Sequence, residues 1–433
     1  MARAWVQPDR PHLARSGLFL AGAVLLFPVV AAFVAAAAPK LALLQHRSLP
    51  VLTANHLVTL GWGTMVALGA LHQLLPAAAG VRHDPSRLIA WQFVLHLAGV
   101  ILLAAGFWSR HTGGLIAGGT AVLTSILISA GTAGWVLARR TRWSWPLSYV
   151  TVALAGLVAA AAWGTTLALN WRLSFWTALL LPAGLTVHLT LGLLLWFALL
   201  ITGISYYLLV RFTTRRTLEG TRVATVFVLL LAGSLAVLSG AFVSPLLVRG
   251  GTLALGAAGL IYAGDLRRFI GAWGRVLDVT RVHWQLIAAQ TVVLSAGLIG
   301  YGSGLLPNTT RWIVAGVTLF LTGWVTLAIT GQAYKVTPFL MWYYRFALGM
   351  PAYDVPRIEA PYWPRAALPP LVLLGAAGPL ISLGVLLGTS WVSAAGGAAY
   401  FLGASVFSWL LGYSWLPRLW KVRSGPAIPA PPG

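Results

Sequence analysis

The sequence predicts an all-α polytopic membrane protein whose twelve transmembrane helices form three pseudo-symmetric arcs of four. Three observations support this fold class. Hydrophobic residues make up 59% of the 433 residues and charged residues only 8%. Apolar runs of about 20 residues recur along the chain, and each is long enough to cross the hydrocarbon core of a bilayer. One pattern of Gly and aromatic residues occurs three times, as in a chain built from repeated units.

The apolar runs define twelve spans in order along the chain. The first run is too long for a typical signal-peptide core and has no convincing cleavage site, so we expect it to cross the membrane. The predicted spans are residues 16–38, 51–76, 88–108, 113–137, 146–169, 182–210, 223–247, 250–265, 284–304, 312–334, 366–388 and 391–416. We expect one membrane domain over residues 1–424, followed by a Pro-rich disordered tail at 425–433.

The basic residues predict the orientation of the spans. With the N-terminus in the cytoplasm, 23 of the 29 Lys and Arg residues fall on the cytoplasmic side. Six fall on the opposite side, namely Lys40, Arg47, Arg110, Arg172, Arg249 and Arg311. This distribution follows the positive-inside rule and predicts that both termini lie in the cytoplasm. The expected location is the inner (plasma) membrane. The net charge of +22 therefore indicates orientation and contact with anionic lipid, and it excludes nucleic acid as the expected partner.

Acidic residues and cysteines restrict the chemistry further. All seven carboxylates lie outside the long apolar runs and on the cytoplasmic side, at Asp9, Asp84, Glu219, Asp265, Asp278, Asp354 and Glu359. Proton pumping is not expected, because the spans then supply no buried carboxylate or Lys for a relay. The chain has no Cys, which excludes disulfides, thiolate metal sites and Cys-attached haem. With only four Met besides, soft ligands for copper are scarce.

The repeated pattern lies in the second, sixth and tenth spans, with repeat cores at 51–76, 186–212 and 313–338. In each, a Trp precedes a Gly by the same interval, and His or Tyr follows that Gly at plus three. The three sets are Trp62, Gly69 and His72; Trp196, Gly203 and Tyr206; and Trp324, Gly331 and Tyr334. The Gly positions are 134 and 128 residues apart, so the repeating unit is four helices. We expect each Gly to permit close helix packing.

With these motifs the chain resembles subunit I of the haem-copper oxidase superfamily, which includes cytochrome oxidases and nitric oxide reductases. The likeness is carried by the run from His56 to Trp62, by Gly69-Ala-Leu-His-Gln-Leu-Leu-Pro76 and by Pro338-Phe-Leu-Met-Trp342. That family has twelve helices in three arcs, with helices 2, 6 and 10 lining the interior. The resemblance implies the same fold here.

The resemblance also implies a haem b and the loss of the oxygen-reducing centre. His56 stands where the family places a ligand of its low-spin haem, and His188 stands at about the level of a copper ligand of helix 6. Helix 7 of the family carries a pair of copper-binding His, and residues 223–247 contain none. Helix 10 carries two haem ligands, and residues 312–334 contain none. We therefore expect one haem b, no copper, and no complete haem-copper oxidase activity.

Three intramembrane histidines are candidate cofactor ligands. His56 and His188 lie at matched depth, about 8–10 Å below the outer ends of their spans. Two axial ligands of one haem must face each other across the iron, so both are candidate metal ligands for a haem standing upright in the membrane. His96 lies about 18 Å deep and would require a tilted haem. Two alternatives are a five-coordinate haem on His56 alone, and no metal at all, with each imidazole bonded to a neighbouring backbone carbonyl or hydroxyl.

These features predict a haem b membrane protein. Its expected role is electron transfer, sensing of nitric oxide or haem, or service as an accessory subunit of a respiratory complex. The expected partners are the lipid bilayer, haem, other respiratory subunits or a quinone, the last through Lys335 or Arg345 on the inner side. His72 and His283 are expected to be hydrogen-bonding residues at the membrane interface. The alternative function is a cofactor-free transporter or scaffold on the same twelve-helix frame.

Overall fold

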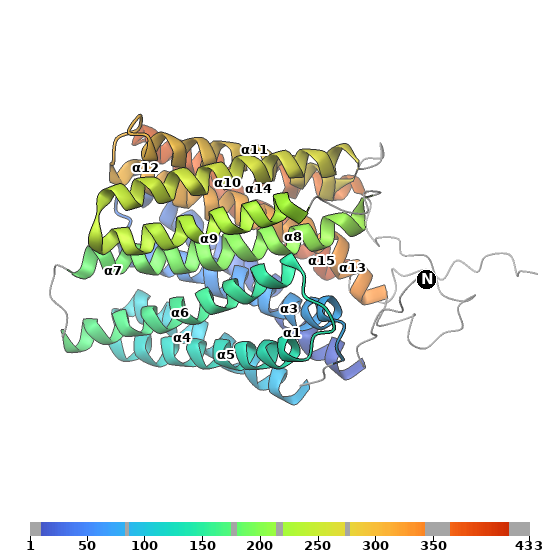
Figure 1. Ribbon diagram of the computed structural model, residues 1–433. Helices are drawn as coiled ribbons and strands as arrows, with labels where there is room; N and C mark the ends of the chain where they lie inside the picture. Colours follow the sequence, from blue (N-terminus) through green and yellow to red (C-terminus); the bar gives the residue numbers. More distant parts are fainter. Residues whose placement is uncertain are drawn as a thin grey trace, which may run out of the picture.

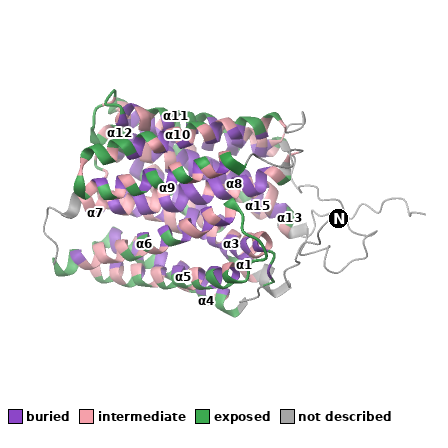
Figure 2. Ribbon diagram, in the orientation of Figure 1, coloured by how far each residue is buried: buried purple, intermediate pink, exposed green. Residues whose placement is uncertain are grey.

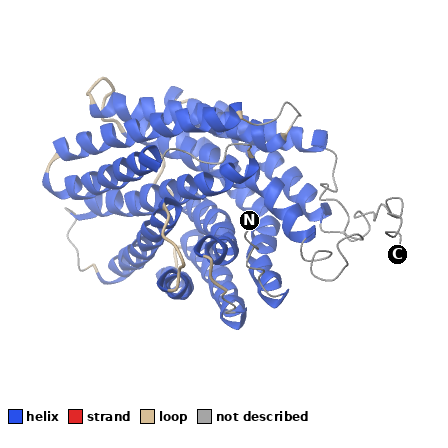
Figure 3. Cartoon of the chain, turned by 45° about the vertical axis from the view of Figure 1, so that its right-hand side comes forward, coloured by secondary structure: helices blue, strands red, loops and turns tan. Residues whose placement is uncertain are grey.

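The computed structural model describes residues 10–82, 86–174, 180–213, 220–272, 278–342 and 364–414. Within these ranges every regular element is a helix (Figure 3). Twelve helical stretches are long and apolar enough to cross a membrane, which confirms the predicted class of multi-pass helical membrane protein. The predicted tail at 425–433 lies outside the described residues, and so do five carboxylates, at Asp9, Asp84, Glu219, Asp354 and Glu359.

Nine of the twelve spans described are single helices. They are α1 (Arg10–Ala42), α4 (Ser86–Ser109), α5 (Thr112–Ala138), α6 (Trp145–Leu173), α9 (Gly220–Val243), α10 (Pro245–Gly271), α11 (Val279–Gly302), α14 (Leu368–Leu387) and α15 (Ser390–Ser414). A short 3-10 turn, η5 (Pro364–Ala367), precedes α14. Successive spans run in opposite directions, and in Figure 1 they lie side by side, with α4 to α6 on one side of the bundle and α10 to α12 on the other.

The second, sixth and tenth spans each consist of three segments. These are α2 (Leu49–His56), η1 (Leu57–Thr64) and α3 (Met65–Ala79); α7 (Leu180–Leu189), η2 (Thr190–Ala198) and α8 (Leu199–Phe212); and α12 (Thr310–Thr318), η3 (Leu319–Val325) and α13 (Thr326–Trp342). Because the chain crosses the bundle twelve times, α1 begins and α15 ends at the same end, which we call the terminal end. The other end is the far end.

The predicted boundary between the seventh and eighth spans is wrong. The turn lies at Ser244, because α9 ends at Val243 and α10 starts at Pro245. The Ser244 hydroxyl accepts a hydrogen bond from the backbone N–H of Leu246 (3.2 Å), and Pro is favoured in the first helical turn. Helix α10 also continues to Gly271, well past the predicted end at 265, and this places Asp265 inside a helix.

The three spans of the repeat line the interior, as predicted. In their most apolar stretches 61, 72 and 72% of the residues are buried, against 28–50% in the other nine spans described. Figure 2 shows buried residues concentrated along the middle of the bundle and exposed residues on its outer faces. Many exposed side chains are large and apolar, such as Leu25 (72% exposed), Val243 (74%) and Trp391 (74%). An apolar outer surface of this kind is suited to contact with lipid.

Each interior span contains a π-helical segment at the same place in the repeat. The segments η1, η2 and η3 contain the three repeated Trp residues, Trp62, Trp196 and Trp324, all of which are buried. The Trp196 indole N–H donates to Thr64 Oγ1 (3.0 Å), which joins the sixth span to the second. Segments of π-helix are rare and often occur at functional sites. The Gly and aromatic pattern of the repeat does not by itself predict them.

The three repeated glycines allow backbones to approach, which confirms their expected role. A Cβ atom at each would lie 2.7, 2.3 and 2.7 Å from the Cβ of a ring-bearing residue in the preceding span. The three pairs are Gly69 with Phe19, Gly203 with Tyr149, and Gly331 with His283. The ring of each such residue also contacts the His or Tyr at plus three, with centroid distances of 6.0, 6.0 and 5.6 Å. The repeat therefore includes the contact of each interior span with the span before it.

Candidate haem site

His56 of the second span and His188 of the sixth span lie close together, in the half of the bundle nearer the far end. His56 is the last residue of α2, and His188 lies one residue before the end of α7. The centroids of the two imidazole rings are 6.2 Å apart, and the ring planes differ by 23°. Two ring nitrogens each about 2.0 Å from one shared metal ion would place the ring centroids about 6 Å apart. The centroid separation is therefore that of two imidazoles on one metal, while the ring planes are nearly parallel and the Nδ1–Cε1–Nε2 edge of His188 faces Gly164 of α6.

Hydrogen bonding fixes the tautomer of His56. Its Nδ1 lies 2.8 Å from the carbonyl oxygen of Leu52, one turn earlier in α2. Because a carbonyl only accepts, Nδ1 carries the proton and donates, which leaves the lone pair on Nε2. Histidines that ligate metals usually donate their other ring N–H in this way to a carbonyl or carboxylate. Phe107 of α4 packs near the ring, with centroids 4.6 Å apart and planes 30° apart.

A glycine of α6 makes room for His188. A Cβ atom on Gly164 would lie 2.8 Å from Cε1 of the imidazole, so a larger residue there would displace the ring. The Nδ1 atom of His188 is buried and makes no hydrogen bond of acceptable geometry, although the backbone of Ala160 in α6 approaches the ring. A buried polar atom without a partner is uncommon in folded proteins, and metal or ligand binding is one reason for it.

The structure does not bring His96 to this pair. His96 lies in α4, is fully buried, and contacts the carbonyl oxygen of Leu60 in η1 through Nε2 (3.0 Å). Nε2 therefore donates to that carbonyl, and the buried Nδ1 of His96 has no hydrogen-bond partner, as in His188. Within the described residues, no group of three or more His, Cys, Asp or Glu is placed to hold a metal ion.

His72 and His283 lie toward the terminal ends of α3 and α11, and both are buried within the bundle, at 7% and 0% exposed. Both do form hydrogen bonds. His72 Nε2 lies 2.7 Å from Oε1 of Gln92, and His283 Nδ1 donates to the carbonyl of Val279 (2.8 Å). The close packing of Phe19 and Tyr334 against these rings explains their burial.

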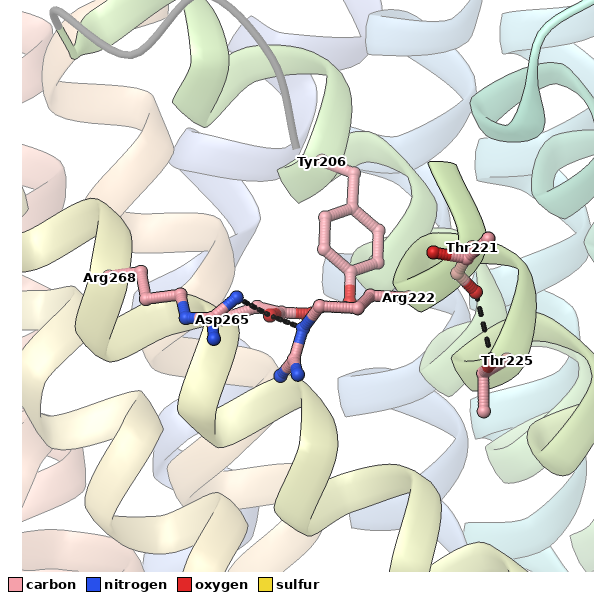
Figure 4. A network of polar contacts seen from close by, with 6 residues as sticks. All are labelled: Tyr206, Thr221, Arg222, Thr225, Asp265 and Arg268. Carbon is pink, nitrogen blue, oxygen red and sulfur yellow. Dashed lines mark hydrogen bonds and ion pairs between the residues drawn. The ribbon is translucent and has the colours of Figure 1, made fainter. Parts of the chain in front are cut away.

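A buried carboxylate contradicts the prediction that the spans contain none. Asp265 is fully buried in α10, and its two oxygens accept from the Arg222 Nε–H of α9 (2.8 Å) and the Tyr206 hydroxyl of α8 (2.9 Å). Figure 4 shows Arg222, Tyr206 and Arg268 converging on this side chain, with Arg268 at 4.0 Å. An acidic residue is tolerated here because each of its oxygens has a partner and a cation lies against it.

The terminal end contains a second ion pair. Lys335 of α13 lies 2.6 Å from the carboxylate of Asp278, which also caps α11 by accepting from the backbone N–H of Thr280. Lys335 is therefore engaged within the protein. Arg345, the other residue considered for a quinone, lies outside the described residues.

Comparison with protein-family models and with curated proteins gives no match for this chain.

The sequence did not predict the roles of two residues beside the histidine pair, Phe107 and Gly164, or of two at the terminal end, Arg222 and Asp265. Phe107 and Gly164 carry no local pattern that marks them, because their roles depend on which helices pack together. Asp265 and Arg222 did carry a signal. They lie near the terminal ends of two consecutive antiparallel spans, where opposite charges can meet.

Proposed function

We propose that this chain is a haem b-binding membrane protein of the haem-copper oxidase subunit I-like type, with one haem held between His56 and His188. The observation that carries the proposal is the pairing of these two imidazole rings, 6.2 Å apart, on two interior spans. An intramembrane His is costly unless it has a function or a partner, and here two meet. The proposal includes no oxygen-reducing haem-copper centre, since the described site offers no third ligand of the His, Cys, Asp or Glu type.

Four residues would hold or surround this cofactor. His56 and His188 would be the axial ligands, and a bound haem b would supply reversible one-electron transfer. The Leu52 carbonyl holds His56 in the tautomer with a free Nε2, and Gly164 leaves space for the His188 ring. Phe107 packs near His56 and helps to exclude water. Because His56 and His188 would both be engaged in holding the haem, electron transfer is favoured over binding of a gas as the primary role.

The proposal includes the arrangement of the spans. Three arcs of four helices agree with the interior position of the second, sixth and tenth spans and with the repeated Gly contacts to the span before each. A cytoplasmic terminal end in the inner (plasma) membrane agrees with the excess of Lys and Arg in the loops and termini assigned to that end. The far end would then face outward.

Proton pumping is not part of the proposal, although Asp265 is buried. This carboxylate lies near the terminal end of α10 and is held by Arg222 and Tyr206. The other described carboxylate, Asp278, is paired with Lys335 at the same end. No described Asp, Glu or Lys lies in the middle of the bundle to continue a proton path from there to the far end.

The test is the absorption spectrum of the purified protein. Wild type is expected to show a sharp Soret band and, on reduction, a narrow α band. His56→Ala and His188→Ala are each expected to abolish or shift these bands, because each removes one axial ligand. His96→Ala and His72→Ala should leave the spectrum unchanged. The absence of both bands from wild-type protein supplied with haem would overturn the proposal and favour a cofactor-free transporter or scaffold.

A glycine pair gives a sharper control for the position of His188. Gly164→Ala places a methyl group against the His188 ring, whereas Gly131→Ala in α5 adds one where no atom lies within 4 Å. Gly164→Ala is expected to weaken haem binding about tenfold, as substitutions around metal-binding His commonly do, and Gly131→Ala to leave it unchanged. Equal effects from the two would show that His188 does not hold the haem.

A further inference from the structure

A large opening lies at the far end, apart from the two histidines. Its volume is about 710 Å³. Its lining comes from the end of α1, the connection from α1 to α2, the connection from α4 to α5, and the end of α6. Three of the lining residues are cationic, namely Lys40, Arg47 and Arg110, and two are the indoles Trp108 and Trp171.

The charges around this opening are not balanced within the described part of the chain. The described carboxylates are Asp265 and Asp278, both at the terminal end, where Arg222, Arg268 and Lys335 pair with them. Three cations from three separate segments thus share one opening with no described acid beside them. Like charges at close range repel, so this arrangement favours binding of an anion.

The starts of two helices at the opening add to this preference. The opening includes the first residues of α2, Leu49 and Pro50, and the first residue of α5, Thr112. The N-terminal ends of helices carry partial positive charge, although Pro50 has no N–H and the N–H of Gly114 in α5 already donates to His111 Nδ1. Ser48 also lines the opening, although its hydroxyl oxygen is buried.

The aromatic lining indicates what kind of anion would fit. Trp108 and Trp171 are 58% and 54% exposed, on helix ends where indoles commonly lie at the headgroup layer. Leu49, Pro50 and Leu115 add apolar surface beside them. An occupant with a phosphate group and an apolar body would satisfy both the cations and the indoles.

We propose that the opening binds the phosphodiester headgroup of an anionic phospholipid from the leaflet at the far end. Lys40, Arg47 and Arg110 pair with the phosphate, and Trp108 and Trp171 lie against the upper part of the acyl chains. Neither His56 nor His188 lines this opening, and Phe107 lies between its Trp171 and the His56 ring.

Lipid retention by the purified full-length protein tests the proposal. The protein is delipidated in a neutral detergent and supplied with phosphatidylglycerol, phosphatidylcholine or inorganic phosphate, and bound lipid is counted by native mass spectrometry. Wild type is expected to prefer phosphatidylglycerol. The double variant Arg47→Gln/Arg110→Gln should lose about 30-fold in affinity for it, as expected for two basic contacts. Arg249→Gln, which removes an exposed far-end cation outside the opening, should match wild type.

Three results would overturn the proposal. The first is equal retention of phosphatidylglycerol and phosphatidylcholine. The second is equal competition by inorganic phosphate at the concentration of the lipid, which would indicate a site for free anions. The third is loss of haem from the double variant with phosphatidylglycerol retention unchanged, which would assign the cations to haem propionates. Haem content is measured on the same samples, so a protein without haem that still selects phosphatidylglycerol would refute only the haem assignment.

Discussion

Arg222→Met is expected to lower the free energy of unfolding by about 3 kcal/mol, the low end of the range for breaking a buried ion pair. The variant keeps the length of the side chain but leaves Asp265, which is fully buried, without its closest cation. The partial exposure of Arg222, 29%, moderates the loss. Unfolding of the purified protein in mixed micelles, followed by Trp fluorescence as denaturing detergent is added, measures the change.

Arg268→Met provides a matched control on the same carboxylate. Its guanidinium is 4.0 Å from Asp265 and 44% exposed, so its removal should cost less than about 1 kcal/mol. The double variant Arg222→Met/Asp265→Leu removes both charges and should recover part of the loss caused by Arg222→Met alone. If Arg222→Met proves as stable as Arg268→Met, the buried network is not a stabilising element of the terminal end.

Gly203→Ala is expected to destabilise the protein by about 2 kcal/mol, a typical effect of overpacking a filled interior. The new methyl carbon would lie 2.3 Å from Cβ of Tyr149, an atom that cannot move without its backbone. Helices α6 and α8 must therefore separate. This movement also strains the hydrogen bond from the Tyr149 hydroxyl to the carbonyl of Val223 (3.0 Å).

The control for Gly203 lies in the same span. A Cβ atom on Gly192 in η2 would meet no atom within 4 Å, so Gly192→Ala should change the stability by no more than about 1 kcal/mol, in the stabilising direction. The two variants are compared in the same micelle titration. Equal loss from both would mean that glycine is required in this span for its backbone freedom, and that close packing against Tyr149 is not the reason.

The fold class and the interior spans could be predicted from the sequence because hydrocarbon thickness fixes the length of a span, and because the repeat marks equivalent helices. The ends of the spans were harder to predict from the sequence. The turn at Ser244 depends on one hydroxyl and one Pro within an apolar stretch, which hydropathy does not resolve.

For the histidine pair, the sequence could predict only that the two residues lie at the same depth in the bundle. Depth along a helix follows from residue number, so His56 and His188 were expected at one level. Whether their rings face each other depends on rotation of the two spans about their axes, and π-helical segments alter that rotation. The environment of Asp265 was missed for a related reason. Its partners lie on α8 and α9. From hydropathy alone, Asp265 marks the end of a span, whereas helix α10 continues past it to Gly271.

The π-helical segments have a further consequence for how each interior span is divided. Adding one residue to an α-helix turns everything after it by about 100°, and a wider π turn absorbs such an added residue locally. In the second span, η1 separates His56 from Gly69, so the angular phase of the two halves is set separately. The segment α2, which contains His56, can therefore face the sixth span, while α3, which contains Gly69, packs against Phe19. Deleting a single residue from η1 would force one of these two alignments to be lost.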